Sequence, residues 1–471
     1  MTVIKNYKVN VNQIHKKHYI AVIGGSVAGS EAASLLALNG FKVVVFDMNR
    51  LPYGKIEDGL PNWHINLRNR QINEIDKKLD LPNVRYVPNT KIGDDIHFLD
   101  LVNNWGFSAI ILANGAWQDR HLPIARINKF VDKELIYQNA FIHWFNHKHE
   151  DNYIENKYSI KNKNLVIGGG LSSLDVIKVI MIELVKKQLY EKKGIEIDVF
   201  TLEKNGIDKV LKELDLSLKD LHIEKAKLVY RRTARDMPLK SPRNNSKESI
   251  EAAKDVSKKI LDRYQNKFLF EFIPLCTPVD FTEENEKLKS IIFQRTISKN
   301  GKIEPVEDSF FEIETDMLIS SIGSIPEKIE GLPYDYSSLK MRYETDCHVF
   351  GFENVFAIGN AITGRGNIIE SKKNGKQMTQ LIIDNHLTED AFEKWLINYN
   401  NQLKKEVHQQ IHSIMDEISE YKIQPEKITQ EICDRTHKIH EKMNYSNYLD
   451  WVTENTPVRL ENTLEPNRLK I

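Results

Sequence analysis

Short apolar runs that end at a glycine recur along this chain, and each predicts a buried strand followed by a tight turn. The first run, residues 18–23, leads into Gly24, and a helical stretch from Ser30 to Asn39 and a second strand at Lys42–Phe46 follow it. A strand, a glycine turn, a helix and a second strand form the opening of a βαβ unit. We therefore expect a parallel α/β unit at the start of the chain.

The same pattern opens a second time further along the chain. Residues 108–115 form another buried strand that closes on a glycine, and Lys163–Ile167 is an apolar run that leads into Gly168. Later strands are expected at Met317–Ser321 and Asn354–Ile358. Because each dinucleotide needs its own strand, turn and helix, two such openings predict an α/β fold with two Rossmann-like dinucleotide-binding domains.

The pattern becomes helical after about residue 388. Apolar residues recur at spacings of three or four from Phe392 to Ile418, which places them along one face of a long amphipathic helix. Residues 388–471 hold 15 acids and 11 bases, so this C-terminal tail is mildly acidic. We expect it to form an accessory helical layer on the last domain, with a dimerisation or partner-docking helix as the alternative.

The first glycine turn predicts a dinucleotide site. In a G-x-G-x-x-G turn the first glycine makes the tight turn, the middle one lets the backbone touch a pyrophosphate, and the last lets the helix approach the strand. Ser26 replaces the middle glycine, which weakens the motif. Asp47 lies 23 residues after Gly24, at a strand end where a carboxylate binds the 2′-hydroxyl of an adenosine ribose. The candidate residues of this site are Gly24, Ser26, Val27, Ala28, Gly29 and Asp47.

The second glycine turn is complete apart from Ser173, which takes the place of the third glycine. At the end of the next strand NAD requires an acid, whereas NADP requires cations around its 2′-phosphate. Two candidates compete: Glu203 after a predicted strand at Ile195–Leu202, and two arginines after a predicted strand at Ala226–Tyr230. The candidate residues of this site are Gly168, Gly170, Leu171, Ser172, Ser173, Arg231 and Arg232.

The distribution of charge supports the arginines. The whole chain is balanced, with 66 Lys+Arg and 66 Asp+Glu, which argues against a nucleic-acid coat or a polybasic membrane binder. Residues 225–243 nevertheless hold seven bases and one acid. A solvated helix face explains this run poorly, because its arginines follow an apolar strand and precede Met237 and Pro238.

Cysteine content and hydropathy exclude several other classes of protein. Cys276, Cys347 and Cys433 are too far apart in sequence to form a local metal ribbon, iron–sulfur cluster or redox dithiol. The longest apolar runs fall short of the roughly 18–20 residues that a membrane span needs, and the first residues lack the apolar core of a signal peptide. We therefore expect a soluble, cytoplasmic protein.

Two segments resemble those of known flavoproteins. Leu51–His64 resembles the segment of adrenodoxin-reductase-like and glutamate-synthase-small-subunit-like proteins in which a proline and two glycines guide the chain along FAD. Tyr230–Pro238 is similar to the YRRxxxxMP stretch of glutamate synthase small subunits. The resemblance implies FAD at the first site and NADPH at the second, where the arginines hold the 2′-phosphate. Further FAD-site residues that it implies are Gly54, Lys55, His64, Ile92 and Gly115.

His64 is the side chain that the resemblance places near the isoalloxazine ring of FAD. A structural histidine, satisfied by its neighbours, is the alternative. The implied chemistry requires neither a protein nucleophile nor a metal, because the cofactors carry it.

Later segments resemble the parts of these flavoproteins where the two cofactors meet. Asp316–Ser324 resembles the strand that returns from the NADP domain to the FAD domain. Residues 354–360 and 364–371 resemble a strand-end glycine and a glycine turn that set backbone N–H groups against the flavin, stabilising negative charge on the reduced ring. Asn360 replaces the tryptophan that is usual in adrenodoxin reductases. The residues implied here are Gly359, Asn360, Gly366, Asn367 and Ile368.

The resemblance covers roughly residues 18–386 and implies that the NADP domain is inserted into the FAD domain. The cysteine-rich iron–sulfur region of glutamate synthase small subunits is absent from this sequence, which favours the adrenodoxin-reductase arrangement. The expected organisation is a basic arm at 1–17, an FAD domain at 18–118 and 325–390, an NADP domain at 119–324, and a helical extension at 391–471.

The resemblance also implies a flavoprotein oxidoreductase of the ferredoxin–NADP reductase type (EC 1.18.1). NADPH would give a hydride to FAD, and electrons would pass to a ferredoxin or similar carrier that lysines at 5, 8, 16, 17, 372, 373 and 376 would attract. Alternatives are an electron-input subunit for a partner enzyme and an FAD/NAD(P)-binding, redox-responsive module with little turnover. We expect no nucleic-acid or membrane partner, and the oligomeric alternative is a homodimer through the tail.

Overall fold

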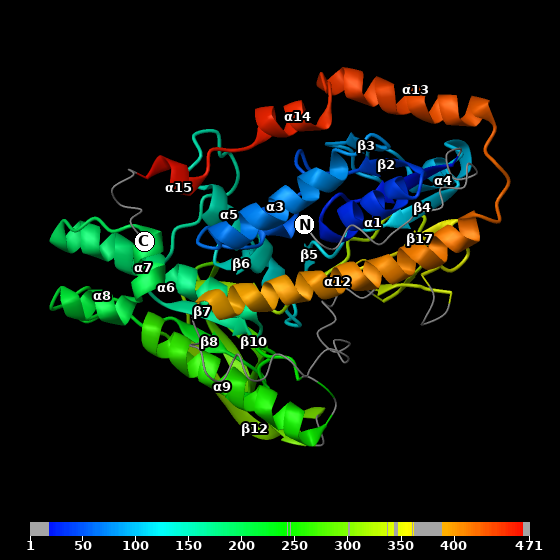
Figure 1. The fold of residues 1–471 in the computed structure, drawn as a ribbon. Coiled ribbons are helices and arrows are strands. Elements are labelled where there is room, and N and C mark those ends of the chain that lie inside the picture. Colours follow the sequence, from blue (N-terminus) through cyan, green and yellow to red (C-terminus); the bar gives the residue numbers. More distant parts are fainter. Residues whose placement is uncertain are drawn as a thin grey trace.

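The computed structural model contains two parallel sheets, each covered by helices, and it confirms the predicted α/β class (Figure 1). We call the first sheet with its helices the first lobe. The second parallel sheet, with its helices and an antiparallel sheet, forms the second lobe. The structure describes residues 18–242, 244, 246–299, 302–336, 338–342, 347–359, 361 and 389–464.

The first lobe is built on five parallel strands in the order β17-β4-β1-β2-β3. The central strand β1 is buried along its whole length, as its apolar run predicts. Ile23 lies opposite Phe46 and Leu112, so the residues that follow these strands meet at one edge of the sheet. The strands are β1 (Tyr19–Ile23), β2 (Lys42–Phe46), β3 (Val84–Val87), β4 (Ala109–Leu112) and β17 (Val355–Ala357).

The second lobe repeats this parallel arrangement in the order β6-β13-β7-β8-β9. A three-stranded antiparallel sheet, β10-β11-β12, extends from it. Ser321 at the end of β13 lies opposite Gly168, where the second glycine turn begins. The strands are β6 (Leu135–Tyr137), β7 (Asn164–Gly168), β8 (Lys227–Val229), β9 (Glu271–Ile273), β10 (Cys276–Glu284), β11 (Lys287–Lys299), β12 (Lys302–Glu314) and β13 (Met317–Ser321).

The two connections between the lobes lie side by side. Strand β5 (Gln118–Asp119) pairs antiparallel with β14 (Ser324–Ile325), and the Arg120 amide donates to the Gly323 carbonyl at 3.0 Å. After this ribbon the chain forms the short hairpin of β15 (Tyr334–Asp335) and β16 (Ser338–Leu339), and β17 then completes the first sheet. The exact bounds of the two domains stay a prediction, which this double crossing supports.

Helices cover both faces of the first parallel sheet and one face of the second, whose other face packs against the antiparallel sheet. None of those in the described part of the chain is both long and apolar enough to cross a membrane. Before the tail the helices are α1 (Val27–Leu38), α2 (Lys55–Asp58), α3 (Ile65–Leu79), α4 (Phe98–Asn104), α5 (Gln138–His147), α6 (Leu171–Lys193), α7 (Val199–Asn205), α8 (Ile207–Glu213) and α9 (Lys247–Phe268), with 3-10 turns η3 (Ile127–Phe130) and η4 (Ala234–Asp236).

The C-terminal tail wraps around the first lobe (Figure 1). Helix α12 (Glu389–Ile418) confirms the predicted long helix, and its apolar residues pack against α1. Val407, Ile411 and Ile418 are fully buried there, as expected for an accessory helical layer, and dimerisation through the tail stays a prediction. The remaining tail helices are α13 (Glu426–Met443), α14 (Tyr448–Asn455) and α15 (Leu460–Thr463).

The strand predicted at Ile195–Leu202 is wrong, because the second half of this segment belongs to helix α7 and the first half forms no strand. The Asp198 carboxylate accepts a hydrogen bond from the Thr201 amide at 2.9 Å and so caps the helix N-terminus. Val199 and Leu202 lie on one helical face and are buried in the core of the second lobe. Their spacing of three therefore reflects a helix rather than the alternation of a strand.

Candidate functional site

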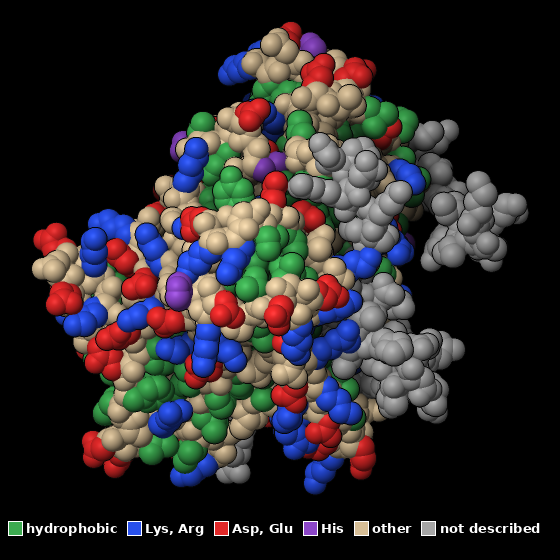
Figure 2. Space-filling model, turned by 90° about the vertical axis from the view of Figure 1, so that its left-hand side faces the viewer, with side chains coloured by type: hydrophobic (Ala, Val, Ile, Leu, Met, Phe, Trp, Pro, Cys, Tyr) green, Lys and Arg blue, Asp and Glu red, His purple; other side chains and the backbone are tan. Residues whose placement is uncertain are grey.

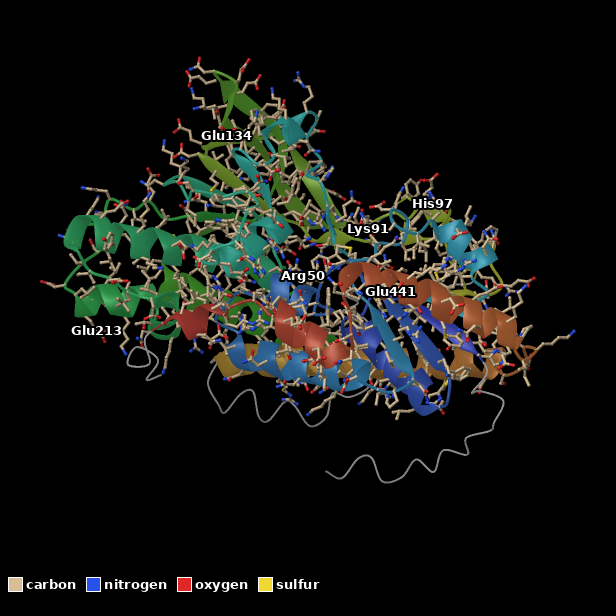
Figure 3. The ribbon with its side chains drawn as sticks, turned by 90° about the horizontal axis from the view of Figure 1, so that it is seen from above. Arg50, Lys91, His97, Glu134, Glu213 and Glu441 are labelled. Carbon is tan, nitrogen blue, oxygen red and sulfur yellow. The ribbon has the colours of Figure 1, made fainter. Side chains whose placement is uncertain are left out.

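A cleft of about 1140 Å³ lies between the two lobes, and both glycine turns line it. This volume exceeds the range of roughly 300–1,000 Å³ that is typical of pockets for one small ligand. Figure 3 shows the two lobes from above, with His97 and Glu441 on the first lobe and Glu134 and Glu213 on the second. The cleft therefore has room for extended ligands that reach into both lobes.

The first turn needs glycine at its first and last positions. Gly24 has φ +99°, and a Cβ there would lie 2.7 Å from the carbonyl oxygen of Ala113. A Cβ at Gly29 would overlap the carbonyl of Gly24, since α1 begins against the end of β1. Helix α1 therefore directs its N-terminus, at Val27 and Ala28, into the cleft.

Ser26 has a structural role that the motif does not predict. Its hydroxyl donates a hydrogen bond to the Tyr53 carbonyl at 3.0 Å. A Cβ added at Gly54 would lie 3.0 Å from the same hydroxyl, so this glycine allows the loop to pass close to the turn. We call the glycine turn 24–29 with the start of α1 the first cradle. The hydrogen bond of Ser26 therefore holds residues 53–54 against this cradle, and both Ser26 and Gly54 line the cleft.

Asp47 lies at the strand end where the sequence predicts a ribose-binding carboxylate. One of its oxygens accepts from the Gly25 amide at 2.7 Å, and the other accepts from the Asn49 amide at 2.9 Å. Burial raises the pKa of Asp47 to about 6, although these two N–H groups oppose the shift. The carboxylate lines a smaller cavity of about 190 Å³ together with Gly24 and Ile92.

A polar cluster joins the lobes where the two cradles approach each other. The Lys55 ammonium group donates to the Ser324 hydroxyl at 2.9 Å, and the Asn139 amide donates to the same oxygen at 3.2 Å. Burial lowers the pKa of Lys55 to about 8, and the Asp119 carboxylate opposes that shift. Burial raises the pKa of Asp119 itself to about 6. Lys55 and Gly115 both line the cleft, as expected for residues near a cofactor.

Helix α12 of the C-terminal tail also lines the cleft, although the sequence does not predict this. Asn400 and Leu403 of α12 line it, and the Asn400 amide donates to the Gln71 side chain at 3.1 Å. Gly359, after β17, has φ +61°, and a Cβ there would lie 3.1 Å from that of Ala28. One signal was present: Asn400 is a polar residue within the apolar stripe of α12. The candidates Asn360, Gly366, Asn367 and Ile368 lie outside the described residues.

His64 does not belong to the described residues that line the cleft. It is buried at the start of α3, where its Nε2 accepts a hydrogen bond from the Trp63 indole at 3.1 Å. The same nitrogen lies 3.9 Å from the Asp175 carboxylate of α6. The structure therefore places His64 in the packed junction between the lobes, which supports its structural interpretation.

In the second cradle, which is the glycine turn 168–173 with the start of α6, the first two glycines have no room for a side chain. A Cβ at Gly169 would overlap the ring of Tyr230, and one at Gly168 would overlap the carbonyl of Ser321. Ser173 donates its hydroxyl to the Gly170 carbonyl at 2.6 Å, so the third position ties the turn to the helix. Helix α6 starts here and runs for 23 residues, and its first residues, Leu171 and Ser172, line the cleft.

Arg231 and Arg232 both line the cleft beyond the end of β8, where the sequence predicts them. Arg231 is exposed and forms no ion pair with a described residue. Arg235, from the same basic run, instead pairs with Asp255 at 2.7 Å and with a second carboxylate of α9. The other candidate, Glu203, is buried in α7, and Lys178 pairs with it at 2.8 Å. Glu203 is therefore not the acid of a strand end.

The structure shares its fold, with two parallel α/β sheets, with a solved oxidoreductase. It is similar to the solved structure of FprA from Mycobacterium tuberculosis in complex with NADPH, with a TM-score of 0.63 and 18% sequence identity. The match covers 90% of this chain and 91% of that one. The predicted fold is thereby confirmed. No family model matches the chain.

Sequence comparisons confirm the predicted resemblance. The chain is 23% identical over 319 residues to the NADPH-Fe(3+) oxidoreductase subunit beta of Geobacter sulfurreducens, which covers 66% of this chain and 38% of the relative. It is 24% identical over 165 residues to the probable mitochondrial NADPH:adrenodoxin oxidoreductase of Schizosaccharomyces pombe, covering 34% of each. It is 29% identical over 163 residues to the glutamate synthase [NADPH] small chain of Bacillus subtilis, covering 34% and 31%. Each of these matches thus covers well under half of the relative's length.

Proposed function

We propose that the chain is an NADPH-dependent flavoprotein oxidoreductase that binds FAD in the first cradle and NADPH in the second. The observation that carries this proposal is that both glycine turns open into one cleft. Two dinucleotides anchored at opposite ends of such a cleft have their reactive rings directed toward each other, which is the arrangement that direct hydride transfer needs. When bound, FAD accepts a hydride from NADPH and passes the electrons on.

The residues of the first cradle fit FAD. The backbone N–H groups at the start of α1 face the place of a pyrophosphate. Asp47, held by two backbone amides, presents carboxylate lone pairs to ribose hydroxyls, and Ile92 lines the same cavity. Gly54, Lys55 and Gly115 would border the flavin end. Ser26 fastens the loop of Gly54 to the turn, so we propose that it keeps this cradle in shape.

The residues of the second cradle fit NADPH better than NADH. The start of α6 offers its N–H groups and the positive end of its dipole to a pyrophosphate. Arg231 and Arg232 follow the strand end at which a 2′-phosphate would lie. An arginine fork binds a phosphate through charge-assisted hydrogen bonds, and the acid that NADH would require, Glu203, is used elsewhere.

Lys55 is the residue of this chain that we propose to act where the two rings meet. Its ammonium group bridges the lobes through Ser324, and it is the cation of a cluster that contains Asp119 and Asn139. A positive charge in a largely dehydrated cleft stabilises nearby negative charge more strongly than it would in water. Its role would be to hold the cofactor ends in register and to stabilise charge.

For the acceptor we propose a ferredoxin-like one-electron carrier, with an electron-input role for a partner enzyme as the second candidate. The second candidate is favoured by the relative that is named an oxidoreductase subunit and is much longer than this chain. The face drawn in Figure 2 intermingles Lys and Arg with Asp and Glu, without a large patch of one sign among its described residues. The lysines proposed to attract an acidic carrier lie outside the described residues.

NADPH oxidation with ferredoxin, flavodoxin, quinone and dye acceptors, compared at low and high salt, tests this proposal. We expect turnover with dye and with ferredoxin, and a loss of ferredoxin activity as salt screens the charges of the complex. Turnover with dye alone would favour the electron-input subunit. Binding of both nucleotides without turnover on any acceptor would contradict the enzyme and favour a redox-responsive binding module.

A further inference from the structure

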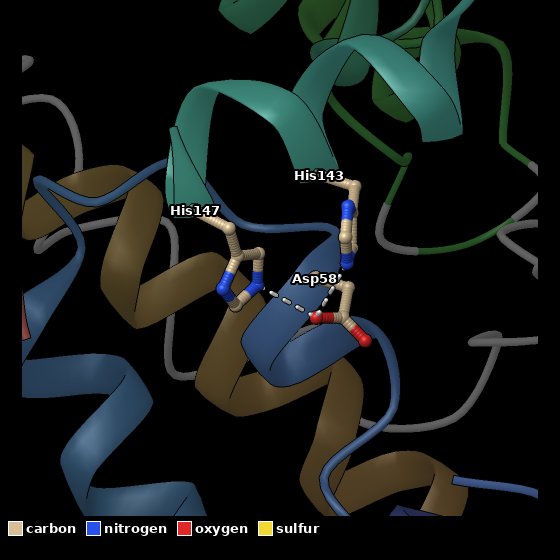
Figure 4. Close-up of side chains that lie close together, drawn as sticks. All are labelled: Asp58, His143 and His147. Atoms are coloured by element: carbon tan, nitrogen blue, oxygen red, sulfur yellow. Dashed lines mark hydrogen bonds and ion pairs between the residues drawn. The ribbon is translucent and has the colours of Figure 1, made fainter. Parts of the chain in front are cut away.

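Two histidines and one aspartate meet at the junction of the lobes, outside the cleft (Figure 4). Asp58 ends helix α2 of the first lobe, and His143 and His147 lie four residues apart on one face of α5 in the second. The Nε2 of His147 is 3.0 Å from an Asp58 carboxylate oxygen, and the Nε2 of His143 is 4.0 Å from the same oxygen. Three ligand atoms therefore converge from two helices, all within 4.8 Å of one another.

Both histidines also have a carboxylate at their second ring nitrogen. The Nδ1 of His147 is 2.6 Å from the Glu150 carboxylate, and the Nδ1 of His143 is 3.2 Å from that of Glu155. A carboxylate that accepts a hydrogen bond from Nδ1 fixes the tautomer and directs the Nε2 lone pair outward. Metal-binding histidines usually have this second partner. The pairing is present on both imidazoles of this cluster.

The cluster holds an excess of carboxylates, whose negative charge a cation would balance. Three carboxylates surround two imidazoles, and the Nε2 atoms of both rings face the same carboxylate oxygen of Asp58. Two lone pairs directed at a carboxylate repel it unless a proton or a metal ion lies between them. A divalent ion would neutralise two of the three negative charges.

We propose that Asp58, His143 and His147 form a zinc site that ties the two lobes together. Nitrogen and carboxylate ligands of this kind suit Zn²⁺, which takes three protein ligands and a water in a tetrahedral arrangement. Bonds of about 2.0–2.1 Å require ligand atoms about 3.3 Å apart, so the three ligand atoms, which lie within 4.8 Å of one another, must approach by at most about 1.5 Å. The side chains are between 11% and 29% exposed, which leaves an entry path for the ion and its water.

The position of the site indicates a structural role. The residue after His143 is Trp144, so the glutamate that serves as general base in an H-E-x-x-H metalloprotease is missing from this pair. Helix α2 begins at Lys55 and α5 begins at Gln138, and both of these residues line the cleft. An ion held between the far ends of the two helices would fix the distance between the cradles.

Titration of the chelator-treated full-length protein with ZnCl₂, followed by calorimetry and elemental analysis, tests the zinc site. We expect one tightly bound Zn²⁺ per chain and a higher melting temperature with Zn²⁺. Replacing both ligands, His143→Ala with His147→Ala, should abolish this binding. The matched control is His437→Ala, because His437 is exposed and also lies near a glutamate of its own helix, yet belongs to no such cluster among the described residues.

A milder variant keeps the test decisive if the double variant fails to fold. Glu150→Gln retains the shape of the side chain but removes the charge behind His147, and it should weaken Zn²⁺ binding by about 10- to 100-fold. The absence of stoichiometric zinc in the wild-type protein would overturn the proposal and leave a hydrogen-bonded ion pair of His147 with Asp58. Undiminished zinc binding in Glu150→Gln, or in a folded double variant, would overturn it as well.

Discussion

The choice between NADPH and NADH rests on Arg231 and Arg232, so their replacement gives the sharpest test of the second cradle. Both side chains line the cleft after β8, and Arg231 has no competing ion pair with a described residue. In the variant Arg231→Ala with Arg232→Ala the 2′-phosphate would lose its cations, while the pyrophosphate would keep the N–H groups of α6. We therefore expect a loss that is confined to NADPH.

The size of this loss follows from the exposure of the site. A hydrogen bond to a charged group contributes about 1.5–3 kcal/mol, and exposure of Arg231 favours the lower end of that range for each arginine. The two together then amount to about 3 kcal/mol, or roughly a hundredfold in kcat/KM at 1.4 kcal/mol for each tenfold. We expect kcat/KM for NADPH to fall by about this factor, mainly through KM, and kcat/KM for NADH to change by less than about threefold.

The assay is steady-state oxidation of NADPH and NADH with a dye acceptor. Arg235→Ala is the control, because Arg235 belongs to the same basic run but pairs with carboxylates of α9. It should behave like the wild type with both nucleotides. Equal losses on NADPH and NADH in the double variant would refute the assignment, and so would a loss in Arg235→Ala as large as that in the double variant.

Three further predictions concern the two cradles and the tail. Gly169→Ala places a Cβ against the Tyr230 ring and should lower the free energy of unfolding by about 1–3 kcal/mol, measured by urea denaturation, whereas Gly170→Ala meets open space and should be neutral by that measure. Asp47 has a pKa raised to about 6 by burial, so folding binds a proton there between about pH 4 and 6. Stability of the apoprotein should therefore fall as pH rises through this window, and less steeply in Asp47→Asn; an unchanged slope would contradict the shift. Ile411→Ala should cost about 2–5 kcal/mol in the same denaturation assay, because this side chain is fully buried against α1; a cost below 1 kcal/mol would show that α12 does not pack there.

The parts of the fold that the sequence predicts are those with short-range signals. The strand at Met317–Ser321 has the predicted bounds. The bounds of the strands before the two glycine turns differ from the predicted ones by one residue at most. The run Ile195–Leu202 shows where such signals fail, because its apolar residues fit a strand by composition, whereas the cap at Asp198 begins a helix in its second half. Local hydrogen bonding therefore decided what hydrophobicity left ambiguous.

The candidate site was predictable where a motif lies within one strand, turn and helix. Asn400 enters the cleft from a helix more than 300 residues away from the first turn, and no local pattern states which lobe that helix covers. Asp58 lies in the segment Leu51–His64, which the sequence marks by its proline and glycines. The pair His143 and His147 forms a candidate metal site only because α5 packs against α2. Packing between distant elements produced these features.

Rapid anaerobic mixing of the purified protein with NADPH, monitored by flavin absorbance, tests most directly whether the two cradles serve one reaction. We expect the protein to hold FAD and NADPH to bleach the oxidised flavin band within the time of a single turnover. NADH should do so only at much higher concentration. A flavin that stays oxidised over minutes in excess NADPH, or a protein that binds no flavin, would contradict this expectation.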